Sequence, residues 1–549
     1  MSTKSQVILP ADSNQALGLA RYAIDFMSAG PAAGRPDAAV LDRTEMFHTD
    51  AVLCGASALA LGTNAPTVLR NEALGYRNPP DAGTLPPLGK AKHHGACVFG
   101  SRERVKSEKA ILANCAAVRE WDSNGTNFGY SEERPEHRAG EFGHNDFYAV
   151  PVAAAQMLGE GGAYALRGMV LLDEIRGRLA EVFSLKTYKI DHVVHGAIAS
   201  AATFGAMMGA TAEQIESAIG MVVAHHIPFR AIRHGHQLSD SKGASAAIST
   251  EAAIVCMKRA MAGFIGPQDI FRNPEAVFCL FKKDTPKGKA PFDLVLSRDG
   301  ADFAVMGMHF KLGLYEHQSA GALQGLIDLL GKHPQLLDRH QGQPGGRIAR
   351  IVVTAYEPAF GIIGDPAKRD PHTRQSADHS MLYLVCTKLR KALELAAPPP
   401  PPSSLPSPGA PKSPQAIADW RSLMLLPHDF SHEAIRHPLT RALMEKMTFQ
   451  HGGPDYDQRY PDGIPTSMQI TDVGNATFDS GLVMYPAGHA RNRTAPLKDI
   501  LRHKWNLLGA LAVDQPASLV SQLTGLNEKS AQEVQSLYDF DIQFRGKFD

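Results

Sequence analysis

The sequence predicts two domains, a large all-α helical domain followed by a smaller α+β domain. The chain has 549 residues, of which 44% are hydrophobic, and a single core usually stops growing at about 250 to 300 residues. From about residue 14 to about residue 280 the sequence is rich in Ala and has helical spacing. After about residue 285, β-branched runs and turn residues alternate with helical stretches. We expect a helical domain over 1–283, an α+β domain over 284–490, and a helical segment over 491–549 that returns to the first domain.

The helical part contains clear start and stop signals. In "TAEQIESAIGMVVAHH", Thr211 and Gln214 fit a capping box, which predicts that a helix begins there. Gly209, just before it, is expected to end the preceding helix in "HGAIASAATFGAMMG". A third helix is expected to begin near "SDSKGASAA", with Lys242 in its first turn. The many Ala and Gly residues predict close helix–helix approach.

The α+β part mixes two periodicities. Strands are expected in "GRIARIVVTAYEPAF" and "TSMQITDVGNATFDSGLVMYP", and helices in "GALQGLIDLLGKH" and "HSMLYLVCTKLRKALELAA". Between them lies a proline-rich insertion, residues 397–414, which has almost no apolar content to bury. Such composition favours polyproline II or disorder. We expect a solvated spacer, with a docking motif as the alternative.

Composition excludes several classes of function. Lys plus Arg and Asp plus Glu number 56 each, so there is no overall basic field to attract nucleic acid or anionic lipid. No apolar run approaches the roughly 18 to 20 residues of a membrane span. The six cysteines form no CxxC pair, which argues against zinc and iron–sulfur sites. No P-loop and no convincing GxGxxG motif is present. We therefore expect no nucleic-acid, membrane, metal or cofactor partner.

The first candidate site lies in two polar stretches, "REWDSNGTNF" from Arg119 and "EFGHNDFY" from Glu141. Asp122 and His144 are residue types that serve as general base and general acid when burial and neighbours tune their pKa values. Thr126 adds a hydroxyl between them. The alternative is structural, since Asp122 or Thr126 could cap a helix.

A second group of candidates follows in "YKIDHVVHGA" and "RAIRHGHQLSDSKGASA". His192 stands at an expected helix start, where it is neither a usual cap nor an apolar packing residue. Arg233, His234 and Lys242 belong to a basic loop that leads into a helix N-terminus, a place that suits an anion. The loop predicts binding of a polycarboxylate or phosphate, with a solvated basic loop as the alternative. His317, in "MHFKLGLYEHQSAGA", precedes a further helix.

These motifs, in this order, resemble the MmgE/PrpD family, and within it the eukaryotic type of 2-methylcitrate dehydratase. The stretches that carry the resemblance are "REWDSNGTNFGY", "GHNDFY", "DHVV", "SDSKGASA", "MHFKLGLYEHQSAGA", "SADHSMLY" and "YPDGIPT". The resemblance runs from about residue 15 to the C-terminus. It implies an α+β lid inserted between the two helical segments, an active site in the cleft, a metal-independent reaction and a homodimer.

The resemblance also implies residue roles. Asp122, Thr126, His144, His192 and Lys242 are expected to be catalytic, and Arg233, His234, Lys242 and His317 are expected to bind substrate. The implied reaction removes water from 2-methylcitrate, a tricarboxylate, to give 2-methyl-cis-aconitate in the methylcitrate cycle of propionate catabolism. Asp122 or His192 is expected to be the base and His144 the acid.

Three alternatives remain open at this point. They are dehydration of a longer alkylcitrate in a specialised pathway, decarboxylation of cis-aconitate, and a binding protein without activity. The expected location is cytoplasmic or mitochondrial, because the first thirty residues resemble neither a secretory signal nor a clear transit peptide.

Overall fold

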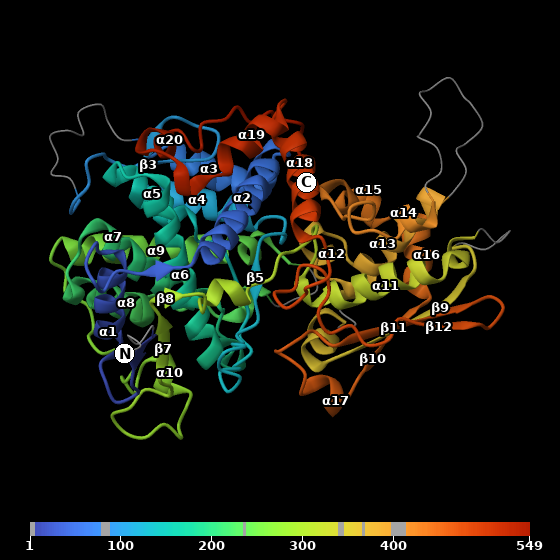
Figure 1. Ribbon diagram of the computed structural model, residues 1–549, viewed down its shortest axis with the longest axis horizontal. Helices are drawn as coiled ribbons and strands as arrows, with labels where there is room; N and C mark the ends of the chain where they lie inside the picture. The colour runs from blue at the N-terminus through green and yellow to red at the C-terminus, as the bar shows by residue number, and fades with distance from the viewer. Residues whose placement is uncertain are drawn as a thin grey trace.

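The computed structural model describes residues 6–77, 88–233, 238–338, 345–364, 368–396 and 413–548. Figure 1 shows helices of the first half gathered on one side and a four-stranded sheet with its covering helices on the other. His234 and residues 397–412 of the proline-rich insertion lie outside the described residues. The predictions made for them therefore stay predictions.

Helices dominate the first half of the chain. Their bounds are α1 Gln15–Met27, α2 Ala38–Ala60, α3 Asn64–Leu74, α4 Ser107–Arg119, α5 Ala149–Leu158, α6 Gly162–Val182, α7 Val193–Met208, α8 Ala212–His225, α9 Asp240–Met261 and α10 Val277–Leu280. Short helical turns accompany them at η2 Leu185–Tyr188 and η3 Arg230–Arg233. Helix α7 is buried almost throughout and packs against α6, α8 and α9. The long Ala-rich helices thus form the main core.

The expected helix boundaries are confirmed where capping chemistry defined them. Helix α8 begins with a reciprocal capping box between Thr211 and Gln214. Helix α7 ends at Gly209, whose φ of 82° lies in the left-handed region that glycine adopts without a Cβ penalty. Lys242 lies in the first turn of α9, and His192 is the N-cap residue of α7.

The first half is not purely helical, which corrects the all-α expectation. Its strands are β1 Gln6–Leu9, β2 Arg35–Pro36, β3 Ala96–Cys97, β4 Arg104–Val105, β5 Thr126–Asn127 and β6 Gly143–His144, with β7 Leu294–Ser297 and β8 Asp299–Gly300 farther along. Most have two residues, too few to show the alternation that reveals a strand in a sequence. Strand β1 pairs antiparallel with β7, and β2 pairs parallel with β8. Strands β7 and β8, which lie just after the predicted domain boundary at residue 284, thus pair with strands near the N-terminus.

The later part of the chain holds a mixed four-stranded sheet in the order β10–β9–β11–β12. The strands are β9 Ile348–Ala355, β10 Met447–His451, β11 Thr466–Asp472 and β12 Thr477–Asp479. Strand β10 runs parallel to β9, whereas β11 runs antiparallel to both β9 and β12. The strands expected in "GRIARIVVTAYEPAF" and "TSMQITDVGNATFDSG" are therefore confirmed.

The helices of this part of the chain alternate with its strands. They are α11 Ala320–Lys332, α12 Arg374–Ala377, α13 Met381–Ala396, α14 Pro414–Ile417, α15 His432–Ile435, α16 Pro438–Glu445 and α17 Pro454–Asp457. Shorter turns are η4 Ala304–Gly307, η5 His317–Ser319, η6 Pro334–Leu337, η7 Ala359–Ile363 and η9 Pro427–Phe430. Helix α11 packs against β11. A Cβ atom on Gly321 would lie 2.5 Å from the Thr466 hydroxyl, so the glycine permits this close approach.

The C-terminal segment returns to the first helices. It contains α18 Leu497–Ala512, α19 Pro516–Leu523, η10 Leu526–Glu528 and α20 Ala531–Gln535. Helix α18 packs along α2, and α20 packs against α5. In Figure 1 the red C-terminal helices lie beside the blue N-terminal ones. The molecule is helix-rich with a few small sheets, and its division into two domains stays a prediction.

Two further features concern membranes and thiols. Within the described ranges no single helix is long and apolar enough to cross a membrane, and only the pair α2 and α3, bent by 91°, meets the requirement jointly. All six cysteines are free, and five of them are buried.

Candidate active site

Hydrogen bonds join the two polar stretches into one site. Strand β5 pairs with β6 so that Thr126 lies opposite His144. The Asn124 amide donates to Asn145 Oδ1 at 3.0 Å and to Asp146 Oδ1 at 2.6 Å. The two loops between α4 and α5 are therefore held face to face, which explains why so many short polar side chains occur there.

Asp122 lies at the centre of a buried charge cluster. Its carboxylate contacts Lys311, lies 2.5 Å from Arg119 Nη1, and lies 3.3 Å from Lys242 Nζ. His379 Nε2 approaches it to 3.2 Å. Burial raises the pKa of Asp122, but Arg119, Lys311 and Lys242 outweigh burial and hold the pKa well below its usual range. Asp122 is therefore ionised at neutral pH.

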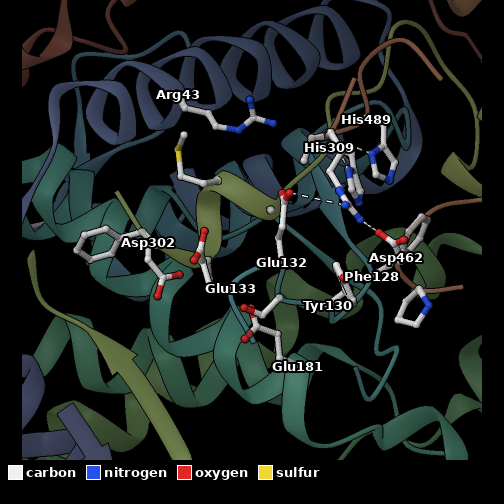
Figure 2. Close-up of a pocket in the computed structure, with 18 of the residues that line it drawn as sticks. Arg43, Phe128, Tyr130, Glu132, Glu133, Glu181, Asp302, His309, Asp462 and His489 are labelled. Carbon is white, nitrogen blue, oxygen red and sulfur yellow. Dashed lines mark hydrogen bonds and ion pairs between the residues drawn. The ribbon is translucent and has the colours of Figure 1, made fainter. Parts of the chain in front are cut away.

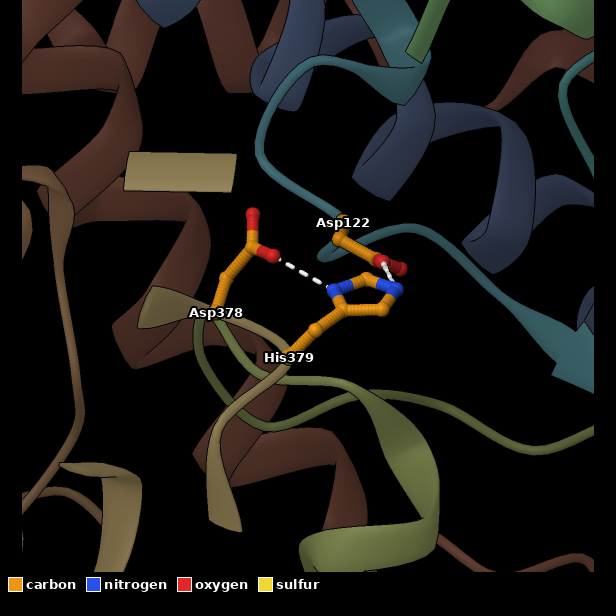
Figure 3. Close-up of side chains that lie close together, drawn as sticks. All are labelled: Asp122, Asp378 and His379. Atoms are coloured by element: carbon orange, nitrogen blue, oxygen red, sulfur yellow. Dashed lines mark hydrogen bonds and ion pairs between the residues drawn. The ribbon is translucent and has the colours of Figure 1, made fainter. Parts of the chain in front are cut away.

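Asp378 extends this cluster from the later part of the chain. Its carboxylate lies 3.3 Å from Lys242 Nζ and 2.5 Å from His379 Nδ1, and Arg374 Nη1 lies 3.2 Å away. Figure 3 shows His379 between the two carboxylates, with one ring nitrogen facing Asp378 and the other facing Asp122.

The same three side chains have the composition of a metal site, since potential ligand atoms of Asp122, Asp378 and His379 lie within 4.8 Å of one another. Lys242 contacts both carboxylates, however, and Arg119 and Lys311 contact Asp122. A divalent cation placed among three cationic side chains would be repelled. The donor set fits a buried ion-pair network better than a metal centre.

His144 and His192 form an imidazole pair beside Asp122. His144 Nδ1 and His192 Nε2 are 3.4 Å apart, and His144 Nε2 lies 3.7 Å from Asp122 Oδ1. Burial lowers the pKa of both histidines well below 6.5, and nearby Arg119 lowers both further. Both rings are therefore neutral at pH 7 in the free protein. A neutral imidazole has one nitrogen free to accept a proton.

Asp191 holds the basic loop in place. Arg233 Nη2 donates to Asp191 Oδ1 at 3.1 Å, and Arg233 Nε donates to Asp191 Oδ2. Arg230 stands one short helical turn earlier, in η3. The bidentate geometry fixes the guanidinium of Arg233 in the lining of the site. His234 lies outside the described residues.

These side chains line a narrow cleft with a free volume of about 60 Å³. Its lining includes six residues that the sequence analysis selected, namely Asp122, Thr126, His144, His192, Arg233 and Lys242. The structure thus brings together residues that lie up to 120 positions apart in the sequence. The hydroxyl of Thr126 donates to the Gly143 carbonyl at 2.8 Å, so it also stabilises the loop.

His317 occupies a different position from the one expected for a substrate ligand. It is absent from the cleft lining, and its ring stacks parallel to that of His309 with centroids 5.1 Å apart. It is 1% exposed, and neither ring nitrogen has a hydrogen-bond partner within the described structure. Its substrate-binding role stays a prediction. Phe128, whose ring centroid lies 5.5 Å from that of His317, lines the cleft.

Several lining residues were not selected from the sequence. They are Arg119, Arg230, Glu316, Gln318, Lys368 and His379. Five cationic side chains and two carboxyl groups line the cleft: Arg119, Arg230, Arg233, Lys242 and Lys368, with Asp122 and Glu316. Burial raises the pKa of Glu316 to about 7, which reduces the negative charge further. The excess of cations favours an anionic ligand.

A residue of the C-terminal helix supports the site from behind. Lys504 in α18 is fully buried and pairs with Asp50 at 2.8 Å. Its Nζ also donates to the backbone oxygens of Ser123 at 2.7 Å and Lys311 at 2.9 Å. Lys504 therefore holds the two loops that carry Asp122 and Lys311, and we regard it as a positioning residue.

Residues 35–288 match the model of the MmgE/PrpD N-terminal domain. The resemblance to the MmgE/PrpD family that the sequence motifs indicated is confirmed, because the matched range contains Asp122, His144, His192 and Lys242.

Curated relatives have names that agree with one another. The chain is 22% identical over 458 residues to a 2-methylcitrate dehydratase of Salmonella typhi, covering 79% of this chain and 82% of the relative. It is 25% identical over 338 residues to a mitochondrial 2-methylcitrate dehydratase of Yarrowia lipolytica, covering 60% of this chain and 55% of that relative. An Escherichia coli K12 protein of the same name is 22% identical over 335 residues, covering 60% of each chain.

Proposed function

We propose that this protein is a hydro-lyase that eliminates water from 2-methylcitrate to give 2-methyl-cis-aconitate. The observation that carries the proposal is the cleft in which Lys242, Arg119 and Arg233 meet two neutral imidazoles. The names of the relatives indicate the same reaction. A place in propionate catabolism belongs to this proposal.

Substrate carboxylates would bind the cationic side of the cleft. Arg230, Arg233 and Lys368 line it together with Lys242. Arg233 is already fixed by Asp191, so it loses little side-chain entropy when a carboxylate binds. Because the free volume is only about 60 Å³, the facing segments must separate to admit a tricarboxylate. Closure over the substrate would then exclude water.

His192 is the better candidate for the base. Asp122 is held ionised by three cations, and a carboxylate with so low a pKa is a poor acceptor for a carbon-bound proton. The neutral imidazoles of His192 and His144 have lowered pKa values in the free protein. A bound trianion brings negative charge close to them, which raises their pKa and favours proton uptake.

The leaving hydroxyl needs a proton donor. Glu316 lines the cleft, and burial raises its pKa to about 7. A carboxylic acid that keeps its proton near neutral pH can donate it to the departing oxygen, which leaves as water. His144 is the alternative donor, since it lies beside His192 and can receive the abstracted proton. Lys242, which lines the cleft, would stabilise the charge that develops on the substrate carboxylate.

A direct assay tests the proposal. Purified protein, treated with a chelator, is offered 2-methylcitrate, citrate and a longer alkylcitrate while ultraviolet absorbance follows the conjugated alkene. Preferred turnover of 2-methylcitrate supports the proposal, and preferred turnover of the longer substrate places the protein in a specialised pathway. Carbon dioxide released from cis-aconitate without dehydration of any citrate would establish the decarboxylase instead.

A further inference from the structure

A second and larger cavity lies next to the cleft. Its free volume is about 310 Å³, and Figure 2 shows the residues that surround it. Phe128 lines both this cavity and the cleft. The wall combines Arg43 of α2 with three loops, residues 130–133, 301–307 and 489–493. The cavity is thus separate from the proposed reaction site but shares an aromatic wall with it.

Most of the acidic groups at this cavity already have cationic partners. Asp302 pairs with Arg134 at 2.6 Å and with Arg178 at 2.7 Å. Glu181 pairs with Arg178 at 2.9 Å, and Asp462 pairs with Arg491. Glu132 pairs with Arg491 at 3.6 Å. Glu133, which is exposed, forms no ion pair among the described residues.

Two guanidinium groups at the cavity have no such partner. Arg43 donates to the backbone oxygens of Val305 at 3.2 Å and Met308 at 2.5 Å. Arg493 donates to the backbone oxygen of Ala490 at 3.0 Å. Among the described residues, neither forms an ion pair with a carboxylate. Burial and the neighbouring Arg493 lower the pKa of Arg43 to about 10, so it still carries its charge at neutral pH.

Two histidines add neutral donors to the same wall. The Ala490 amide donates to His309 Nδ1 at 2.9 Å, and the Arg491 amide donates to His489 Nδ1 at 3.1 Å. Both rings are neutral, because burial lowers the pKa of His309 well below 6.5 and that of His489 to about 3. An accepting Nδ1 in a neutral ring places the proton on Nε2.

The Nε2 atom of His489 is therefore an N–H donor. It is buried and has no hydrogen-bond partner in the described structure, and the side chain is 3% exposed and lines the cavity. A buried donor without an acceptor is destabilising by about 1–3 kcal/mol. An acceptor oxygen of a ligand would satisfy it.

We propose that this cavity is a second small-molecule site, which binds an organic dicarboxylate between Arg43, Arg493 and His489. Two unpaired cations outnumber the one unpaired carboxylate, the exposed Glu133, and guanidinium groups suit carboxylates because they donate in a planar fork. Phe128, Phe303 and Met306 supply an apolar surface for the carbon chain. That surface favours an organic dianion over inorganic phosphate. The proposal does not depend on the proposed hydro-lyase activity.

Equilibrium dialysis of the full chain with radiolabelled succinate tests this site. The variant Arg493→Glu reverses a charge on an exposed side chain, so we expect it to fold, which circular dichroism checks. We expect wild type to bind one equivalent of succinate at this site. The variant should bind that equivalent at least about tenfold more weakly. The matched control is Arg502→Glu, whose side chain is 69% exposed on α18 and pairs only with Asp499 among the described residues.

Counting bound succinate separates this proposal from the first one. If the cleft also binds succinate, wild type holds two per chain and Arg493→Glu holds one. If the cleft does not bind it, the numbers are one and none. Equal binding by wild type and Arg493→Glu would overturn the second site. Displacement of the Arg493-dependent succinate by an equal concentration of inorganic phosphate would overturn the organic class of ligand.

Discussion

Lys311 contacts both the side chain and the backbone of Asp122. Its Nζ contacts the carboxylate and lies 2.9 Å from the Asp122 backbone oxygen. The two residues are 189 positions apart. Asp122 has a φ of 48°, a conformation that Asp and Asn tolerate better than most residues. This double contact fixes the turn on which the whole charge cluster depends.

We expect Asp122→Asn to lower both stability and turnover. Asn keeps the backbone conformation but leaves Arg119, Lys242 and Lys311 without their shared carboxylate, and removing one partner of a buried ion pair is destabilising by about 3–5 kcal/mol. Turnover should fall at least about 100-fold. Urea denaturation and the alkene assay measure the two effects.

A double variant separates charge from geometry. Asp122→Asn with Lys311→Met removes one uncompensated cation, so it should be more stable than Asp122→Asn alone. The control Asp419→Asn changes a carboxylate that pairs with Arg421 near the surface, and it should alter stability by no more than about 0.5 kcal/mol. A double variant less stable than the single one would contradict the charge argument.

We expect His192→Gln to lower kcat by about 10²–10⁴-fold, the usual contribution of a general base. The substrate KM should change much less, because Arg230 and Arg233 remain. Steady-state kinetics on folded protein provide the measurement. His225→Gln, at the exposed end of α8, serves as the control. Near-normal kcat in His192→Gln together with a large loss in His144→Gln would transfer the role of base to His144.

Turnover should depend on the protonation of Glu316. Burial raises its pKa to about 7 against the opposing effect of Lys311, so the proton-donating form dominates below pH 7 and is lost as the pH rises through 7. We therefore expect kcat/KM, which reports the free protein, to fall on the alkaline side. Glu316→Gln should have a lower kcat/KM without this alkaline decline. If the decline persists unchanged in the variant, another group donates the proton.

Stability should also depend on pH through Glu141. This carboxyl is fully buried, and burial raises its pKa from 4.5 to about 7, although the Lys186 amide opposes the shift. The folded state therefore binds a proton that the unfolded state has already released between pH 4.5 and 7. The contribution of Glu141 to the free energy of unfolding is fully present below pH 4.5. It decreases as the pH rises from 4.5 through 7, and the total loss is about 3 kcal/mol.

Other titrating groups also change the free energy of unfolding with pH, so the effect of Glu141 is measured as a difference between wild type and a variant. From pH 5 to pH 8, wild type should lose about 2–3 kcal/mol relative to Glu141→Gln in urea denaturation. Glu445→Gln changes an exposed carboxyl at the end of α16 and should follow wild type across the range. Parallel curves for wild type and Glu141→Gln would show that Glu141 does not hold a proton in the folded state.

Gly196 should tolerate no side chain. A Cβ atom there would lie 2.0 Å from the ring of Phe147, which follows the loop that carries His144. We expect Gly196→Ala to destabilise the fold by about 1–3 kcal/mol through overpacking, measured by thermal and urea unfolding. Gly331→Ala in α11, where the new Cβ would lie 3.5 Å from Ala418, should be neutral or stabilising by up to about 1 kcal/mol. Equal effects of the two substitutions would contradict the packing argument.

Local chemistry explains what the sequence determined by itself. The capping box of Thr211 and Gln214, the helix end at Gly209 and the strands β9 and β11 each depend on neighbouring residues or on a short period. The family motifs likewise indicated Asp122, Thr126, His144, His192 and Lys242, all of which line the cleft. Patterns within a few residues are sufficient for such predictions.

Only the tertiary structure decided which distant groups complete the site. Lys311 and His379 occur in quoted motifs, but nothing near them in the sequence shows that they face Asp122. Lys504 reaches the same loops from the C-terminal helix α18. The two-residue strands β5 and β6 could not be predicted from the sequence either, because two residues are too few to show the alternation of a strand. The physical reason is common to all of them: contacts between residues far apart in the chain depend on how whole helices pack, which local propensity does not encode.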